Sequence, residues 1–148
     1  MKKILILILF LTTACGYQPI YFGKNTNDFN FNKITLIGNK KINNNIVTTL
    51  NFKLQNTKDS KDEVILNSNI NIYETSKNSK GQVATYRTTI KVNLKIKDNN
   101  NLIKDKDFLK SFSYNNLENK FDLVKYQKDI ENSLTKKIIE ELIIYLSL

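Results

Sequence analysis

Apolar and polar side chains alternate without interruption from Ala84 to Lys97. A period of two residues is the period of a β-strand, whose successive side chains point to opposite faces of a sheet. The sequence therefore predicts a long strand with one buried face and one solvent face. The buried set is Ala84, Tyr86, Thr88, Ile90, Val92, Leu94 and Ile96, and the solvent set is Thr85, Arg87, Thr89, Lys91, Asn93, Lys95 and Lys97.

Shorter patterns on both sides of this strand complete an α+β domain. The loop at 76–81 is typical of a hairpin turn in which Gly81 takes positive φ. The first expected elements are a strand at 34–37 and a helix capped at 43–45, with Ile46, Leu50 and Leu54 on one face. Strands at 64–73, 84–97 and 102–114 follow, the last of them bulged near Lys104 and Asp105. A helix at 123–148 ends the chain. This β-α-β-β-β-α order predicts a two-layer sandwich, in which two helices cover one face of a four-stranded, mostly antiparallel sheet.

The N-terminus has the three parts of a secretory signal peptide. Lys2 and Lys3 give a positive start, residues 4–11 are all apolar, and small residues precede Cys15. A helix needs about 20 apolar residues to cross a bilayer, so the run at 4–11 is too short for a permanent anchor. The sequence predicts a signal peptide at 1–14, a leader segment at 15–32, and one α+β domain at 33–148.

Cys15 follows small residues in a pattern that resembles the lipobox of bacterial lipoproteins, with Thr12 at the place where that family usually has Leu. The resemblance implies that cleavage leaves Cys15 as the first residue and that it carries acyl chains. Three chains hold a protein on a membrane permanently, because each buried methylene contributes about 0.8 kcal/mol. Gly16 stands where Asp would retain many such proteins at the inner membrane, which implies the periplasmic side of the outer membrane.

The residue inventory argues against catalysis. The chain has no His and a single Cys, so His-dependent triads and His-ligated zinc are excluded and no internal disulfide forms. No Gly-rich phosphate loop or metal-ligand cluster is present in the sequence. We expect a binding protein without a cofactor or metal, and not an enzyme.

A basic face on the long strand suggests an anionic ligand. Arg87 and Lys91 point the same way in a strand, Lys77 and Lys80 lie in the loop before it, and no acid shares the face within that strand. With a net charge of +9, such a patch favours phosphate-bearing partners. The alternative is the ordinary solvated face of a Lys-rich protein. Nucleic acid is disfavoured as a ligand, because export would separate the protein from it.

Three stretches resemble the LptE family of lipopolysaccharide-assembly lipoproteins. They are residues 15–21 (CGYQPIY), 81–86 (GQVATY) leading into Val92-Asn93, and 108–112 (FLKSF) before the final helix. The resemblance implies a protein that plugs and helps assemble an LptD-like outer-membrane β-barrel and binds lipopolysaccharide during its insertion into the outer leaflet. It also implies that basic residues at the hairpin, here Lys77 and Lys80, contact the ligand. Ser79 replaces the family's arginine, and Lys80 is its expected substitute.

The sequence leaves one alternative open. A structural lipoprotein that acts only as a barrel plug or assembly chaperone would need the anchor and the fold, but not the basic face. Affinity for lipopolysaccharide distinguishes the two.

Overall fold

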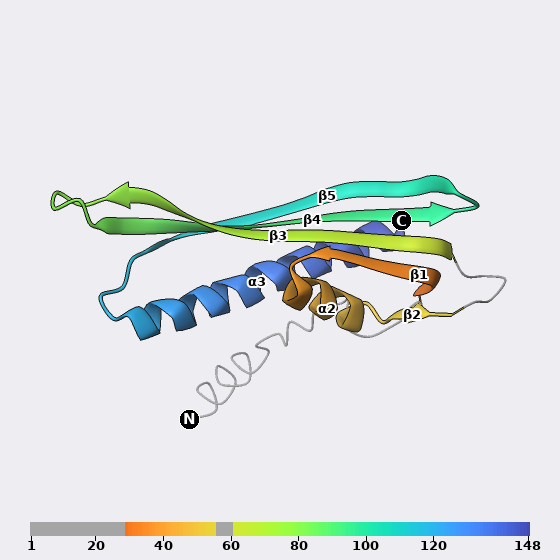
Figure 1. Cartoon of the computed structure of the whole chain (residues 1–148), viewed down its shortest axis with the longest axis horizontal. Coiled ribbons are helices and arrows are strands. Elements are labelled where there is room, and N and C mark those ends of the chain that lie inside the picture. The colour runs from red at the N-terminus through yellow and green to blue at the C-terminus, as the bar shows by residue number, and fades with distance from the viewer. Residues whose placement is uncertain (1–28, 56–60) are drawn as a thin grey trace, which may run out of the picture.

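A five-stranded sheet forms one layer of the molecule and two helices form the other (Figure 1). The computed structural model describes residues 29–55 and 61–148. The elements are β1 (Phe29–Gly38), α2 (Lys40–Thr49), β2 (Phe52–Leu54), β3 (Lys61–Lys77), β4 (Val83–Asp98), β5 (Asn101–Asn115) and α3 (Lys120–Ser147). The predicted α+β two-layer class is confirmed, with one more strand than expected.

The strands lie in the order β2-β1-β3-β4-β5. The sheet is antiparallel across β3, β4 and β5, in agreement with the mostly antiparallel prediction, because β4 pairs antiparallel with both β3 and β5. β1 runs parallel to β2 and to β3, since α2 returns the chain before each of those strands begins. β1 also starts at Phe29, so the last four residues of the predicted leader belong to the sheet. The signal peptide, Cys15 and the rest of the leader lie outside the described residues.

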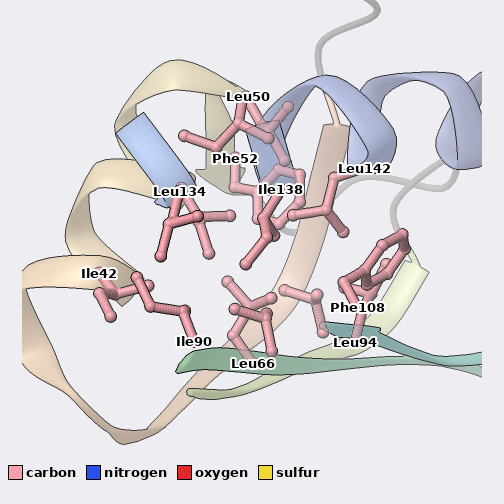
Figure 2. Packing of buried hydrophobic residues seen from close by; sticks show 14 of the residues in the cluster. Ile42, Leu50, Phe52, Leu66, Ile90, Leu94, Phe108, Leu134, Ile138 and Leu142 are labelled. Atoms are coloured by element: carbon pink, nitrogen blue, oxygen red, sulfur yellow. The ribbon is translucent and has the colours of Figure 1, made fainter. Parts of the chain in front are cut away.

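The alternation in β4 is confirmed by its burial. Every second residue from Thr88 to Ile96 is buried, and its partners Leu66 in β3 and Phe108 in β5 are buried on the same side. Figure 2 shows Ile90 and Leu94 facing the side chains of α3. The helix contributes Ile130, Leu134, Ile138 and Leu142 to this core. Full burial of each such side chain contributes about 1.5–3 kcal/mol.

The predicted boundaries of the first helix are wrong at both ends. α2 begins earlier than expected, because its N-cap is Asn39, whose Oδ1 accepts from the Ile42 N–H at 3.0 Å. It also ends earlier, because Asn51 adopts the left-handed conformation with φ of 53° that commonly follows a helix. Leu54 therefore lies in β2, where it is 70% exposed, and not on the helix face.

Replacing Asn39 by alanine should reduce the free energy of unfolding by about 1 kcal/mol, because the Ile42 N–H loses its acceptor at the start of α2. Asn44→Ala is the matched control, since Asn44 is exposed inside the helix and alanine has the higher helix propensity. Urea unfolding of both variants measures the difference. Equal destabilisation by the two changes would contradict the assignment of Asn39 as the cap.

Asparagine and glycine shape the two hairpin turns, and the positive φ predicted for Gly81 is confirmed. Gly81 has φ of 76° in the β3–β4 turn, and its N–H donates to the Asn78 carbonyl at 2.9 Å. Asn99 and Asn100 both have positive φ in the β4–β5 turn, as a two-residue type I′ turn requires. The bulge expected near Lys104 falls one residue earlier, at Ile103, where the pairing register of β5 shifts.

Candidate ligand-binding site

The tip of the β3–β4 hairpin lies at the end of the sheet that is remote from α2 and β2 (Figure 1). Lys77 ends β3, Lys80 lies in the turn, and Arg87 follows on β4. All three side chains are exposed. We refer to residues 77–87 as the hairpin end.

The solvent face of the sheet around β4 carries both positive and negative charges, because the neighbouring strands contribute acids. Within the strand the cations share a face as predicted, but β3 and β5 bring acids beside them. Lys91 pairs with Asp107 at 2.7 Å, and Lys95 with Asp105 at 3.5 Å. Asn93 donates to both of these carboxylates and holds them on the face. The hydrogen bonds from Lys91 and Asn93 lower the pKa of Asp107, so it stays ionised and compensates the strand's charge.

Glu63 on β3 pairs with two further cations of this face. It accepts from the Thr35 hydroxyl at 2.6 Å and pairs with Lys33 at 2.9 Å and Lys97 at 3.5 Å. The hydrogen bond from Thr35, followed by those contacts with the lysines, lowers the pKa of Glu63 from 4.5 to about 2. This half of the solvent face is therefore a network of cross-strand ion pairs that joins β1, β3 and β4.

The depressed pKa of Glu63 makes stability depend on pH in acid. As the pH falls from about 4.5 to about 2, the unfolded chain takes up a proton at this position and the folded protein does not. The free energy of unfolding should fall across this window, and Glu63→Gln should reduce that fall. Urea unfolding between pH 6 and pH 2 measures both slopes. Glu74→Gln, which removes an exposed carboxylate at the hairpin, is the control and should leave the slope unchanged.

The hairpin end differs from the rest of the face. In the described residues, Lys77, Lys80 and Arg87 form no ion pair with an acid, and Arg87 only donates from Nε to Ser113 Oγ at 3.0 Å. The guanidinium keeps its other N–H groups for a ligand. Of the four predicted contact residues, three thus have no acid partner in the described residues, and the fourth, Lys91, pairs with Asp107.

A cleft lies on the opposite, helix-facing side of the hairpin end. Its volume is about 610 Å³, and the β5–α3 connection forms its other wall. Asn116 fixes this wall, because its N–H donates to the Ala84 carbonyl and its Nδ2 to the Val83 carbonyl, both at 2.8 Å. We call it the amide cleft, lined by Asn78, Gln82, Val83, Ala84, Tyr86, Asn116, Leu117, Glu118 and Lys120.

Three tyrosines connect the amide cleft to α3. Tyr86 stacks on Tyr114 with ring centroids 5.8 Å apart, and Tyr114 meets Tyr126 edge to face at 5.6 Å. The Tyr114 hydroxyl is buried and hydrogen-bonded to Thr88 at 3.1 Å. The sequence patterns did not predict this cleft. The alternation placed Tyr86 on the helix-facing side, but only the pairing of Tyr86 with Tyr114 brings the cleft walls together.

Neither a metal centre nor a membrane-spanning helix emerges from the described residues. Across residues 29–55 and 61–148, no three metal-ligating side chains come together. Within the same ranges, each helix is too short or too polar to cross a bilayer.

Two solved bacterial lipoproteins have a similar fold. Rare lipoprotein B from Shewanella oneidensis matches with a TM-score of 0.53 and 13% identity, over 78% of this chain and 93% of that one. An uncharacterized lipoprotein B from Nitrosomonas europaea matches with a TM-score of 0.56 and 12% identity, over 82% and 87%. No protein-family model matches the sequence, and neither does any curated protein. The chain thus has the α+β fold of these bacterial lipoproteins.

Proposed function

We propose that the chain is an outer-membrane lipoprotein of the LptE kind, anchored through Cys15 on the periplasmic side, which binds lipopolysaccharide. The signal-peptide layout and the three resembling stretches support the family. The fold supports it as well, because two bacterial lipoproteins share it along most of their length.

The ligand is inferred from the hairpin end. Lys77, Lys80 and Arg87 carry positive charge that no acid in the described part of the chain neutralises, whereas the cations farther along β4 are compensated by Asp105, Asp107 and Glu63. This contrast within one sheet is the observation that carries the proposal. Phosphates of lipid A would pair with these cations, and Arg87 can bind a phosphate with two parallel N–H groups.

Lys91 belongs to the same proposed contact set but contributes differently. Its ammonium already pairs with Asp107 at 2.7 Å, so a ligand phosphate would have to replace that carboxylate. Part of the binding free energy of the Lys91–phosphate contact is lost, because the contact with Asp107 is broken. Loss of Lys91 should therefore weaken binding less than loss of Lys80.

Binding of this kind involves no bond making or breaking. Contacts to the hairpin end would replace the contacts that hold lipopolysaccharide molecules together in aggregates, and the lipid would be dispersed for insertion. We therefore propose a non-enzymatic role beside an LptD-like β-barrel, whose lumen the α+β domain would plug.

Expression of the full chain with a C-terminal tag in a Gram-negative host tests the anchor and the partner. The mature protein should begin at a triacylated Cys15 in the outer-membrane fraction and co-purify with a large β-barrel. An intact signal peptide or an unmodified thiol at Cys15 would overturn the anchor. Co-purification of a barrel by a protein without lipopolysaccharide affinity would identify a structural plug instead.

A further inference from the structure

An apolar groove continues from the amide cleft along α3. A cavity of about 500 Å³ is lined by Tyr114, Leu117 and Tyr126, among others. A further cavity of about 250 Å³ follows, with Phe112 of β5 on one side and residues of α3 on the other, namely Tyr126, Asp129, Ile130, Ser133, Leu134 and Lys137. The cavities meet at Tyr126, and the first meets the amide cleft at Leu117. We call these two cavities the apolar groove.

Beyond the far end of the groove, an ion pair joins β5 and α3. Lys110, two residues before Phe112, points to the same side of β5 and pairs with Glu141, one helical turn beyond Lys137. Between Tyr126 and Lys137 the helix rises about 16 Å, which sets the length of the groove. At the hairpin end, Gln82, Glu118 and Lys120 line the amide cleft.

We propose that the apolar groove and the amide cleft together hold one glycolipid molecule, with an acyl chain along α3 and the sugar headgroup under the hairpin. This inference rests on the proposed function and specifies how the lipid is held. The acyl chain would be stabilised because its methylene groups leave water and contact Phe112, Ile130 and Leu134. Sugar hydroxyls would meet hydrogen-bonding side chains and the ring of Tyr86 in the amide cleft.

The placement of the amide groups favours an amphiphile over a peptide. Asn78, Gln82 and Asn116 supply amides in the cleft at the hairpin, whereas the groove near Phe112 is lined by aromatic and aliphatic side chains with Asp129, Ser133 and Lys137 beside them. Cations also gather at the polar end, where Lys120 lines the cleft and Lys77 and Lys80 lie on the adjoining hairpin. A lipid with an anionic sugar headgroup matches both the order and the sign of these groups.

A bulky side chain at Ser133 should block the acyl chain. Ser133 is exposed and lines the groove, whereas Asn132 beside it is exposed but does not. Both Ser133→Trp and the control Asn132→Trp introduce the only tryptophan of the chain, because the natural sequence has none. If the new indole of Ser133→Trp enters the groove, its fluorescence should be shifted to shorter wavelength than that of Asn132→Trp.

Dodecyl maltoside below its micellar concentration is the probe, used with the full chain carrying Cys15→Ser so that no acyl chain of its own competes. The probe is uncharged, so its binding does not depend on Lys77, Lys80 or Arg87. We expect the protein with an unaltered groove to bind it more tightly than hexyl maltoside. Ser133→Trp should weaken this binding about tenfold or more, since methylenes return to water. Asn132→Trp should leave it unchanged.

The outcomes separate the inference from the proposed function. Equal binding of dodecyl and hexyl maltoside, equal binding by the two variants, or no binding by the protein with an unaltered groove would overturn the inference. If lipopolysaccharide still bound fully to Ser133→Trp, the groove would be overturned and the proposed function would stand. Dimerisation that Ser133→Trp abolishes, without any binding of the detergent, would identify a second copy as the occupant and would also overturn the inference.

Discussion

Alanine at Gly38 should destabilise the protein by about 3 kcal/mol or more, which is the largest effect we expect from adding a single methyl group. Gly38 ends β1 with φ of 86°, and a Cβ built there would lie 1.9 Å from the carbonyl oxygen of Ser68. That oxygen cannot move freely, because it accepts from the Asn39 N–H at 2.9 Å. The register between β1 and β3 or the start of α2 must therefore shift.

Gly81→Ala is the matched control for this prediction. Gly81 also has positive φ, at 76°, but a Cβ there would meet nothing within 4 Å. Its replacement should cost only the backbone strain, about 1 kcal/mol. Urea unfolding of both variants measures the difference, and similar losses at Gly38 and Gly81 would contradict the close approach of β1 to β3.

Reversing the three uncompensated charges should nearly abolish binding of lipopolysaccharide. The triple variant Lys77→Glu, Lys80→Glu and Arg87→Glu should bind about a hundredfold more weakly at low salt, because three attractions to phosphate become repulsions. The difference should shrink as the ionic strength rises, since exposed charges are screened over about 10 Å at 0.1 M salt. Binding isotherms at two salt concentrations measure both effects.

A second triple variant controls for net charge. Lys125, Lys128 and Lys136 are exposed on α3, and their reversal to Glu changes the total charge by the same amount. This control should bind lipopolysaccharide nearly as the wild type does. If both triple variants lost affinity equally, the attraction would come from the overall charge of the protein and not from the hairpin end.

The sequence predicted the long elements well, because the spacing of apolar residues along a strand or a helix indicates which side chains are buried. The alternation from Ala84 to Lys97 predicted β4, and the helix predicted at 123–148 is α3, which buries Ile130, Leu134 and Ile138 on one face. The first helix was more difficult. Ile46, Leu50 and Leu54 have helical spacing. The helix nevertheless ends before Leu54, because Asn51 adopts the left-handed conformation, which a hydrophobic pattern cannot predict. The short strand β2 was missed for the same reason.

The candidate site was predicted in part. The basic residues follow one another along a single strand, so the sequence shows them, but their acidic partners come from neighbouring strands. The sequence placed Arg87 and Lys91 on one face of a strand, which the structure confirms. Whether each cation has an acid partner depends on the pairing register between strands, which puts Asp107 beside Asn93 and next to Lys91. The amide cleft depends in the same way on the pairing of β4 with β5, which brings Asn116 to Val83 in the hairpin.

Light scattering of purified lipopolysaccharide mixed with the folded protein tests the central claim most directly. At low salt, the wild-type protein should disperse the aggregates and form a small complex, and the hairpin triple variant should leave them intact. Aggregates that persist with the wild type, in a preparation that unfolds cooperatively in urea, would contradict the assignment of this sheet as a lipid-binding surface.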